Sequence, residues 1–405
     1  HLMKKVLSIL MTMAISAQMM AQSEWSATKN CTLDANGNCL PTTILTALPI
    51  LRIAPDARGG AMGEAGIVAD PSASSMHYNP SNLAFAEDKS AVSLNFTPWL
   101  RNLGLDDLYL TYLAGYTKLD QYQTIGFNIR YFSLGSIFFT DNTGGSTGEG
   151  RPREFEIGAA YARKLGDNFS AAVSGKFLMS SLAPGQITGG VIINNATSFA
   201  TDVSFTYRKK TKISNYNGYW AIGMNLSNLG AKVTYTDNND KDFIPTNLGI
   251  GGLLRIDFDN YNSLSFCLDI NKLLVPSPWS IENPKWDAND NDIADWREKT
   301  LFEGVFGSFG DAQAGFSEEL KEFYYSIGTE YLYNKQFAVR AGYYYEHPLK
   351  GARKFFTIGA GIKYNVFEFN LSYLAPSSIQ RNPLDNTLRF GLNFNFEGFK
   401  EGLEE

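Results

Sequence analysis

Beyond its first residues the sequence has no run of about 18 apolar residues, the length from which a membrane-spanning helix is recognised. A helical membrane protein is therefore excluded. The sequence also lacks a block of charge of one sign, because 35 Lys and Arg are mixed with 41 Asp and Glu for a formal net charge of −6. Proteins that bind nucleic acid carry a basic patch or stripe, so no nucleic-acid partner is expected.

Catalytic signatures are missing as well. The sequence has no Gly-x-Ser-x-Gly elbow, no phosphate-binding Walker loop and no histidine-rich metal motif. A lipid hydrolase would need a serine and a histidine brought together by the fold, and His347, beside Pro348, is the remaining candidate. His77 is better explained by packing or hydrogen bonding. We predict a protein that is not an enzyme and requires no cofactor.

Cysteine is scarce, with three residues in the chain. Cys31 and Cys39 lie close together in the sequence, where an oxidising compartment could join them in a disulfide. Cys267 falls within a strand pattern and is expected to be a small packing residue.

The first residues have the layout of a secretory signal peptide. Two lysines follow Met3, an apolar run covers Val6–Ile15, and small or neutral residues complete the segment 3–21. We expect the mature chain to begin at Gln22, with cleavage after Ala17 as the alternative.

The rest of the sequence repeats a period of two. From about Ser90 onward, segments of roughly ten residues alternate apolar and polar side chains before a turn or loop. Such a segment can cross a bilayer as a tilted strand with its apolar face toward lipid. Aromatic residues make up 14% of the chain, which fits the aromatic girdles of a membrane barrel. Clear examples are Trp220–Ser227, Leu264–Asn271, Phe356–Lys363 and Arg389–Phe396.

The connections between these segments alternate between short and long. Short turns are expected near Lys118–Gln121, Leu165–Asn168, Phe258–Asn262, Asn334–Gln336 and Asn365–Val366, with a longer basic one at Lys209–Gly218. Long loops are expected near Pro98–Asp107, Thr140–Arg153, Ala183–Asn195, Ala231–Thr246, Val275–Lys321, His347–Arg353 and Pro376–Asn386. This asymmetry predicts an all-β fold, a transmembrane antiparallel β-barrel of about 14 strands over residues 89–397, with an acidic tail at 398–405. A soluble β-sandwich is the alternative, but its connections show no such two-sided asymmetry.

Residues 22–88 depart from the strand pattern. They contain a Gly/Ala-rich stretch, Arg58–Gly66, and a stretch with Asn79-Pro80-Ser81 at its centre. Small residues let backbones approach closely, and Pro with Asn favours tight turns. We expect this part to form an N-terminal arm and a plug, or hatch, inside the barrel lumen. Charged residues on the polar strand faces would line the lumen and pair with it: Arg130, Lys176, Arg255, Glu330, Arg340, Lys363 and Arg389.

The hatch motif Asn79-Pro80-Ser81 resembles the long-chain fatty-acid transporter (FadL-like) superfamily, whose members carry an Asn-Pro-Ala-type motif in an N-terminal hatch and have fourteen-stranded barrels. Ala54–Arg58 and Ala61–Ile67, with Gly304–Ala312 and Phe316–Glu322, resemble the PorV family within it. That family consists of outer-membrane proteins of the type IX secretion system of Bacteroidetes. The resemblance covers essentially the whole mature chain.

The resemblance implies a function that the residues alone do not supply. PorV-like proteins bind the C-terminal signal domain of secreted cargo as it leaves the translocon barrel. They pass the cargo to a surface attachment complex that contains a sortase-like protease. The implied partners are therefore the type IX translocon barrel, cargo signal domains, the sortase-like complex and outer-membrane lipid. Superfamily resemblance alone implies the alternative, a transporter that admits a hydrophobic small molecule through the lumen.

The longest expected loop, Val275–Lys321, has more aromatic residues than a solvated loop needs. Exposed aromatic clusters often mark protein interfaces. We expect a subset of these residues to bind cargo or translocon. The candidates are Trp279, Trp286, Trp296, Phe302, Phe306, Phe309 and Phe316.

The same loop contains an acidic cluster that could bind calcium. Oxygen-bearing side chains recur at alternate positions, and Glu298 follows where an EF-hand places its bidentate ligand. Asp292 replaces the glycine expected at the sharp turn, and a solvated acidic loop is the alternative. Bound calcium would stiffen the loop. The candidate ligands are Asp287, Asn289, Asn291 and Asp295.

Overall fold

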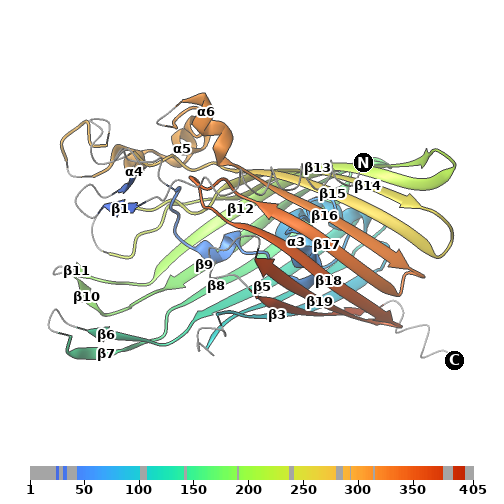
Figure 1. Cartoon of the computed structure of the whole chain (residues 1–405), viewed down its shortest axis with the longest axis horizontal. Helices are drawn as coiled ribbons and strands as arrows, with labels where there is room; N and C mark the ends of the chain where they lie inside the picture. Colours follow the sequence, from blue (N-terminus) through green and yellow to red (C-terminus); the bar gives the residue numbers. More distant parts are fainter. Residues whose placement is uncertain are drawn as a thin grey trace, which may run out of the picture.

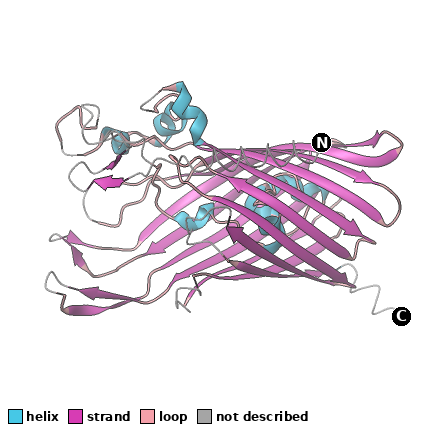
Figure 2. Cartoon of the chain, in the orientation of Figure 1, coloured by secondary structure: helices cyan, strands magenta, loops and turns pink. Residues whose placement is uncertain are grey.

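Fourteen antiparallel strands form a closed barrel, which confirms the predicted fold class. The structure is a computed structural model, and it describes residues 24–26, 31–33, 43–100, 107–140, 144–188, 191–236, 241–279, 286–291, 293–312, 315–376 and 386–396. The strands run obliquely across the barrel, which is seen from the side in Figures 1 and 2. The barrel closes where the last strand pairs with the first, with Phe390 opposite Phe96.

The strands of the barrel are β3 (Ser90–Pro98), β4 (Leu108–Lys118), β5 (Gln123–Leu134), β8 (Arg153–Lys164), β9 (Phe169–Ser181), β12 (Ala196–Ile213), β13 (Tyr216–Gly230), β14 (Asn247–Asp257), β15 (Asn262–Leu273), β16 (Phe323–Tyr333), β17 (Phe337–Tyr345), β18 (Lys354–Tyr364), β19 (Phe367–Pro376) and β20 (Leu388–Asn395).

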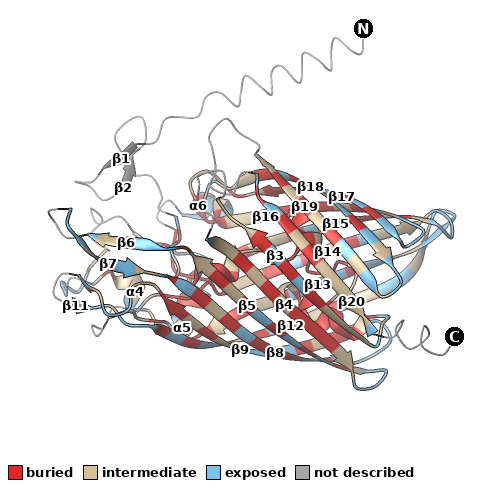
Figure 3. Cartoon of the chain, turned by 90° about the horizontal axis from the view of Figure 1, so that it is seen from below, coloured by how far each residue is buried: buried red, intermediate tan, exposed pale blue. Residues whose placement is uncertain are grey.

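The predicted period of two separates an apolar outer surface from a polar interior. On β15, Phe266 and Leu268 are 49% and 44% exposed, whereas Ser265 and Asp269 between them are 3% and 1% exposed. Figure 3 shows buried and exposed residues alternating along the strands. Alternate side chains of a strand point to opposite faces of the sheet, so one face of each strand meets the surroundings and the other faces the lumen.

The connections alternate as expected, with one correction. Most short turns fall where they were predicted, as between β14 and β15. The basic segment Lys209–Gly218 was predicted to be a longer turn, and this is wrong, because β12 and β13 continue through it as paired strands. Their register runs on to Ile213 opposite Tyr216, so the turn itself is short.

Two of the expected long loops contain hairpins of their own. The loop after β5 holds β6 (Ile137–Thr140) and β7 (Ser146–Gly150), and the loop after β9 holds β10 (Ile187–Thr188) and β11 (Val191–Ile192). Both hairpins lie beyond the barrel wall at the long-loop end (Figure 1).

The segment of residues 43–88, which we call the hatch segment, lies within the barrel (Figure 1). Its second helix packs against β17 to β20, and its last helix against β5, β8, β9 and β12. The Asp56 side chain accepts a hydrogen bond from the Gly59 amide at 2.9 Å and starts the second helix. The helices are η1 (Pro49–Arg52), α2 (Ala57–Ala61), α3 (Ser75–Tyr78) and η2 (Pro80–Phe85).

A glycine pair brings the hatch segment against the barrel wall. Gly63 has a φ of 67°, which favours glycine. A Cβ on Gly342 of β17 would stand 2.0 Å from the Gly63 nitrogen. The two backbones are therefore in direct contact, and no larger residue fits at either position.

Several predictions from the sequence concern parts of the chain with no description. The signal peptide (3–21), the acidic tail (398–405) and Cys39 lie outside the described residues, so the predicted disulfide stays a prediction. In the N-terminal arm, β1 (Glu24–Ser26) pairs with β2 (Cys31–Leu33). Cys267 is a free and buried thiol, as expected for a packing residue. No helix within the described ranges is long and apolar enough to cross a membrane.

Candidate functional site

The long-loop end of the barrel carries a group of short helices between β15 and β16 (Figure 1). We call residues 293–312 and 315–322 the loop cap. Thr300 and Glu303 form a reciprocal capping box at the start of its longest helix, with the Thr300 amide donating to the Glu303 carboxylate at 2.8 Å. The helices are α4 (Asp295–Glu298), α5 (Leu301–Gly307), α6 (Phe316–Glu319) and η4 (Leu320–Glu322).

Buried ion pairs hold the loop cap on the barrel rim. Lys272, at the end of β15, lies 3.1 Å from Glu319 and also contacts Glu322. Lys350, in the loop after β17, lies 2.6 Å from Glu318 and 3.0 Å from Glu322. These side chains are at most 5% exposed. Because a buried charge is costly without a partner, these ion pairs fix the position of α6 and η4 on the rim.

The centre of this cluster is Glu322. Burial by itself would raise the pKa of its carboxyl group, but hydrogen bonds from Lys272 and Ser277 and the charge of Lys350 hold the pKa below its usual 4.5. Burial raises the pKa of Asp311 nearby, and Lys299, at 3.5 Å, opposes that rise. The Glu322 carboxylate therefore stays ionised at neutral pH as the shared acceptor of both lysines.

Large apolar side chains face solvent on the loop cap. Phe306 and Phe316 are 74% and 75% exposed, and Phe302, Phe309 and Leu320 are 61%, 49% and 53% exposed. The tryptophans predicted beside them, Trp279, Trp286 and Trp296, are half-buried instead. The structure thus separates the seven candidates into four exposed phenylalanines and three half-buried tryptophans. Exposed aromatic residues on a fixed backbone are typical of protein interfaces.

The residues of the predicted calcium site bond to one another. Asp287 and Asp295 accept hydrogen bonds from the backbone amides of Asn291 and Ala288 at 3.0 and 3.2 Å. The amides of Asn289 and Asn291 donate to Glu298 at 2.6 and 2.8 Å. Among the described residues, no three His, Cys, Asp or Glu side chains are grouped as a metal site. Calcium binding at Asp287, Asn289, Asn291 and Asp295 stays a prediction.

The hatch motif fixes the hatch segment by hydrogen bonds. The Asn79 side-chain amide donates to the Ile67 carbonyl at 3.0 Å and to the Thr206 hydroxyl of β12 at 2.9 Å. Its carbonyl oxygen accepts from the Ser81 amide at 3.1 Å, while Pro80 begins η2. Asn79 is fully buried. The motif is therefore a structural joint between two parts of the hatch segment and the wall.

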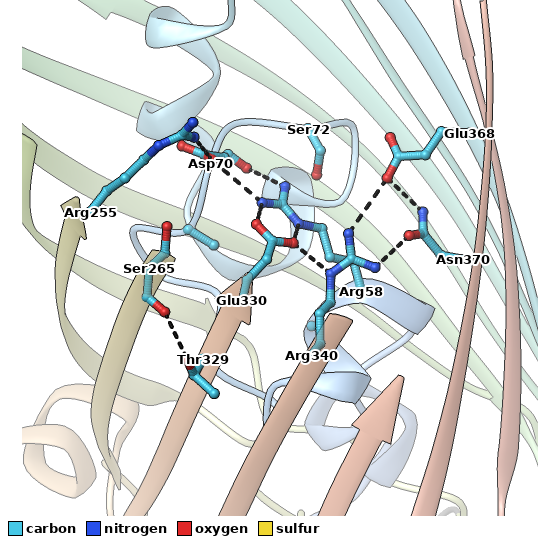
Figure 4. A network of polar contacts seen from close by, with 12 residues as sticks. Arg58, Asp70, Ser72, Arg255, Ser265, Thr329, Glu330, Arg340, Glu368 and Asn370 are labelled. Carbon is cyan, nitrogen blue, oxygen red and sulfur yellow. Dashed lines mark hydrogen bonds and ion pairs between the residues drawn. The ribbon is translucent and has the colours of Figure 1, made fainter. Parts of the chain in front are cut away.

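A charge network ties the hatch segment to β14, β16 and β17 (Figure 4). The Arg58 guanidinium of α2 donates to both carboxylate oxygens of Glu330 on β16, at 2.7 and 3.0 Å. Arg340 of β17 donates to the same carboxylate at 2.5 Å. Asp70 accepts from Arg255 of β14 at 2.7 Å. Paired guanidinium and carboxylate groups of this kind give strong and directional contacts.

Three of the other charged side chains expected in the lumen, Arg130, Lys176 and Arg389, also have partners inside the barrel. Arg389 pairs with Glu64 of the hatch segment at 2.7 Å, and Lys176 pairs with Asp202 at 2.7 Å. Arg130 donates to the Ile50 carbonyl at 2.7 Å and lies 2.8 Å from the His77 ring nitrogen. His77 is thereby placed in a hydrogen-bonding role. Lys363, near the end of β18, is half-buried.

A small polar cavity lies between the hatch segment and the wall. Its volume is about 80 Å³, and its lining includes Glu64, His77, Asn225 and Asp269. Sites for drug-sized molecules usually occupy about 300–1,000 Å³ and are mostly apolar. This cavity is therefore too small and too polar for a hydrophobic ligand.

Comparison with known families identifies the family of this chain. The family model described as "Type IX secretion system protein PorV" matches residues 36–280. The chain belongs to the PorV family. It is an outer-membrane β-barrel component of the type IX secretion system. Outer-membrane barrels have short periplasmic turns and long extracellular loops, so we expect the long loops of this chain, with the loop cap, to face the exterior.

Solved structures similar to this PorV-family chain have low sequence identity and include two toluene transporters and a FadL homologue. The toluene transporter TbuX of Ralstonia pickettii is 13% identical, with 84% of this chain and 96% of that chain covered and a TM-score of 0.46. The toluene transporter TodX of Pseudomonas putida is 14% identical, with coverages of 83% and 95% and a TM-score of 0.47. A Pseudomonas aeruginosa FadL homologue is 10% identical, with coverages of 88% and 100% and a TM-score of 0.41. No curated protein matches the sequence.

Sequence reasoning missed the residues that seat the loop cap. By the period of two, Lys272 falls in phase with Leu268 and Ile270, on the apolar face of β15. A charged residue on the apolar face of a strand requires an oppositely charged partner, and this mismatch was the signal in the sequence for a contact at Lys272. The acidic partners follow each other in the stretch Glu318–Glu322, which the sequence analysis treated as part of an irregular loop.

Proposed function

We propose that this PorV-family barrel binds the C-terminal signal domain of secreted cargo on the exposed apolar surface of the loop cap. The cargo leaves the translocon barrel, docks on the loop cap and is delivered to the surface attachment complex with its sortase-like protease. The barrel itself catalyses no bond chemistry.

The observation that carries this proposal is the exposure of large apolar side chains on a firmly seated support. Phe306 and Phe316 are about three-quarters exposed, while the ion pairs of Lys272 and Lys350 fix α6, the helix that begins at Phe316. A surface that is ordered before binding loses less conformational entropy when a partner docks. Apolar anchors on such a surface are the usual centres of binding energy.

The lumen supports docking outside the barrel rather than passage through it. The hatch segment is joined to the wall by the Arg58–Glu330 and Arg389–Glu64 pairs and by Asn79. The cavity beside it is small and polar. The alternative, transport of a hydrophobic small molecule, requires a continuous apolar path from the loops past the hatch segment, and this cavity does not offer one.

A binding measurement with purified protein tests the proposal. The double variant Phe306→Ser/Phe316→Ser removes the two most exposed large apolar side chains of the described loop cap. Anchors of this type contribute about 1–2 kcal/mol each or more, so affinity for a purified cargo signal domain should fall on the order of 100-fold. Phe138→Ser is the matched control, because Phe138 is 73% exposed but lies in β6 of another loop.

The two variants give distinguishable results. Loss of binding in the double variant with retention in Phe138→Ser supports docking on the loop cap. Equal affinity of wild type and the double variant would contradict it, as would equal losses in both variants. Point variants are preferable to deletion of the loop, because deletion would leave Lys272 and Lys350 without their carboxylates.

A further inference from the structure

An apolar groove of about 920 Å³ lies on the outer wall of the barrel, across β3, β4, β5, β8 and β9. Its sides are outward-facing residues such as Ile125, Phe127 and Val173, which are 41%, 42% and 51% exposed. Its floor contains Ala159 paired with Gly175, where a Cβ would meet open space. The hollow therefore arises because small residues stand between bulky ones on a surface that faces the membrane.

One end of this groove is polar. Ser90 and Thr117, which pair at the periplasmic end of β3 and β4, share a hydrogen bond of 2.7 Å between their hydroxyls. The Tyr161 hydroxyl donates to the Gln123 side chain at 2.5 Å. Arg163 stands two residues further toward the β8–β9 turn, on the same outward face as Tyr161, and is exposed. The groove thus has a polar end at Ser90 and Thr117 and an apolar body, and Arg163 stands just beyond its lining on the side of the periplasmic rim.

We propose that this groove is a binding site for one phospholipid of the inner leaflet of the outer membrane. The acyl chain would lie over Ala159 and Gly175, between Phe127 and Val173. The phosphate would lie at Arg163 beside the Tyr161 hydroxyl. The order of these groups matches the order of a phospholipid's parts, with the charged headgroup at the interface and the hydrocarbon toward the membrane centre.

The shape of the groove favours a lipid over a second barrel. Two barrel walls are both convex and meet along a line, so a neighbour would rest on the flanking aromatic rings and leave the hollow unfilled. An acyl chain is thin and flexible enough to reach the floor at Gly175. The volume also falls in the range of about 300–1,000 Å³ that is usual for small-molecule sites. This inference needs only the membrane location and is independent of cargo binding.

Photolabelling in lipid nanodiscs tests the proposal. The folded barrel is placed in nanodiscs that contain phosphatidylglycerol with a photoreactive acyl chain, and labelled peptides are mapped by mass spectrometry. Gly175→Phe fills the floor of the groove. Gly252→Phe is the matched control, because Gly252 of β14 also has open space at its Cβ position but lies on another part of the outer wall.

The expected result is labelling concentrated on β5, β8 and β9, reduced at least fivefold in Gly175→Phe and unchanged in Gly252→Phe. Arg163→Ala should weaken retention of phosphatidylglycerol about fivefold in native mass spectrometry, the effect of one basic side chain beside an anionic membrane surface. Ala159→Phe gives the same test if Gly175→Phe does not fold. Uniform labelling around the barrel, equal labelling in both glycine variants, or cross-links from this wall to another barrel instead of lipid would overturn the proposal.

Discussion

Replacing Lys272 by methionine should release the loop cap while the barrel stays folded. Lys272 and Lys350 are the two cations that pair with the buried carboxylates of Glu318, Glu319 and Glu322. Without Lys272, Glu319 loses its ion-pair partner, and Lys350 is left as the cation paired with Glu318 and Glu322. Removing one partner of a buried ion pair costs about 3–5 kcal/mol. The helix α6 should therefore open roughly 200- to 5,000-fold more often.

The same cluster predicts that Glu322→Gln is much milder. This change leaves each lysine with one carboxylate, Lys272 with Glu319 and Lys350 with Glu318, so that the charges balance. The loop cap then loses only the stabilisation of a few hydrogen bonds, about 1 kcal/mol each. Adding Glu322→Gln to Lys272→Met should recover part of the lost stability, because it removes one of the unbalanced carboxylates.

Hydrogen exchange of residues 315–322 measures these effects directly, and heat-dependent migration in gels shows whether the barrel is folded. We expect fast exchange in Lys272→Met, near wild-type exchange in Glu322→Gln and intermediate exchange in the double variant. Unchanged protection in Lys272→Met, or equal damage from both single variants, would refute the reasoning from charge balance.

Three further predictions concern pH, the hatch segment and a helix cap. The folded-state pKa of Glu322 is lowered, so the ionised carboxylate stabilises the loop cap fully above the usual value of 4.5, and this stabilisation is lost as the pH falls through the folded pKa. Protease cleavage of the loop cap should therefore rise below about pH 4.5. Constant cleavage from pH 7 to pH 3 would contradict this. Arg58→Gln removes both hydrogen bonds to Glu330, so amide hydrogen exchange in α2 should accelerate. Exchange in η2 should stay slow, because Asn79 still holds that helix. Equal acceleration in both helices would show that the hatch segment opens as one body. Thr300→Ala removes the capping box and should cost about 1 kcal/mol, seen as roughly fivefold faster exchange in α5 alone; an unchanged rate would mean that packing, not the cap, fixes the helix.

The barrel could be predicted from the sequence because lipid and lumen impose opposite demands on alternate residues. This constraint acts on every membrane-spanning position, as at Phe266 and Asp269. It ends where the strand leaves the membrane. Lys209, Lys210 and Lys212 broke the pattern and suggested a turn, although β12 and β13 stay paired there. Beyond the membrane, backbone pairing continues without the apolar face that reveals it.

The partners of the inward charges could not be predicted from the same pattern. The period of two shows that Glu330 faces the lumen, but its partner Arg58 lies 272 residues away in the sequence. Which inward groups meet depends on the path of the hatch segment, which no local pattern records. In the loop cap, Thr300 and Glu303 form a capping-box signature that could have indicated α5. The contact between Lys272 and Glu319 of α6 could be found only from the folded structure.

The most direct test of cargo docking is cross-linking in cells that are actively secreting. A photoreactive amino acid placed at position 306 or 316 reports what touches the loop cap, and one at position 138 serves as the control on a different extracellular hairpin. Our account predicts that positions 306 and 316 cross-link to C-terminal signal domains of secreted proteins and that position 138 does so far less. Cross-links to cargo from position 138 alone, or none from the loop cap during secretion, would contradict the account.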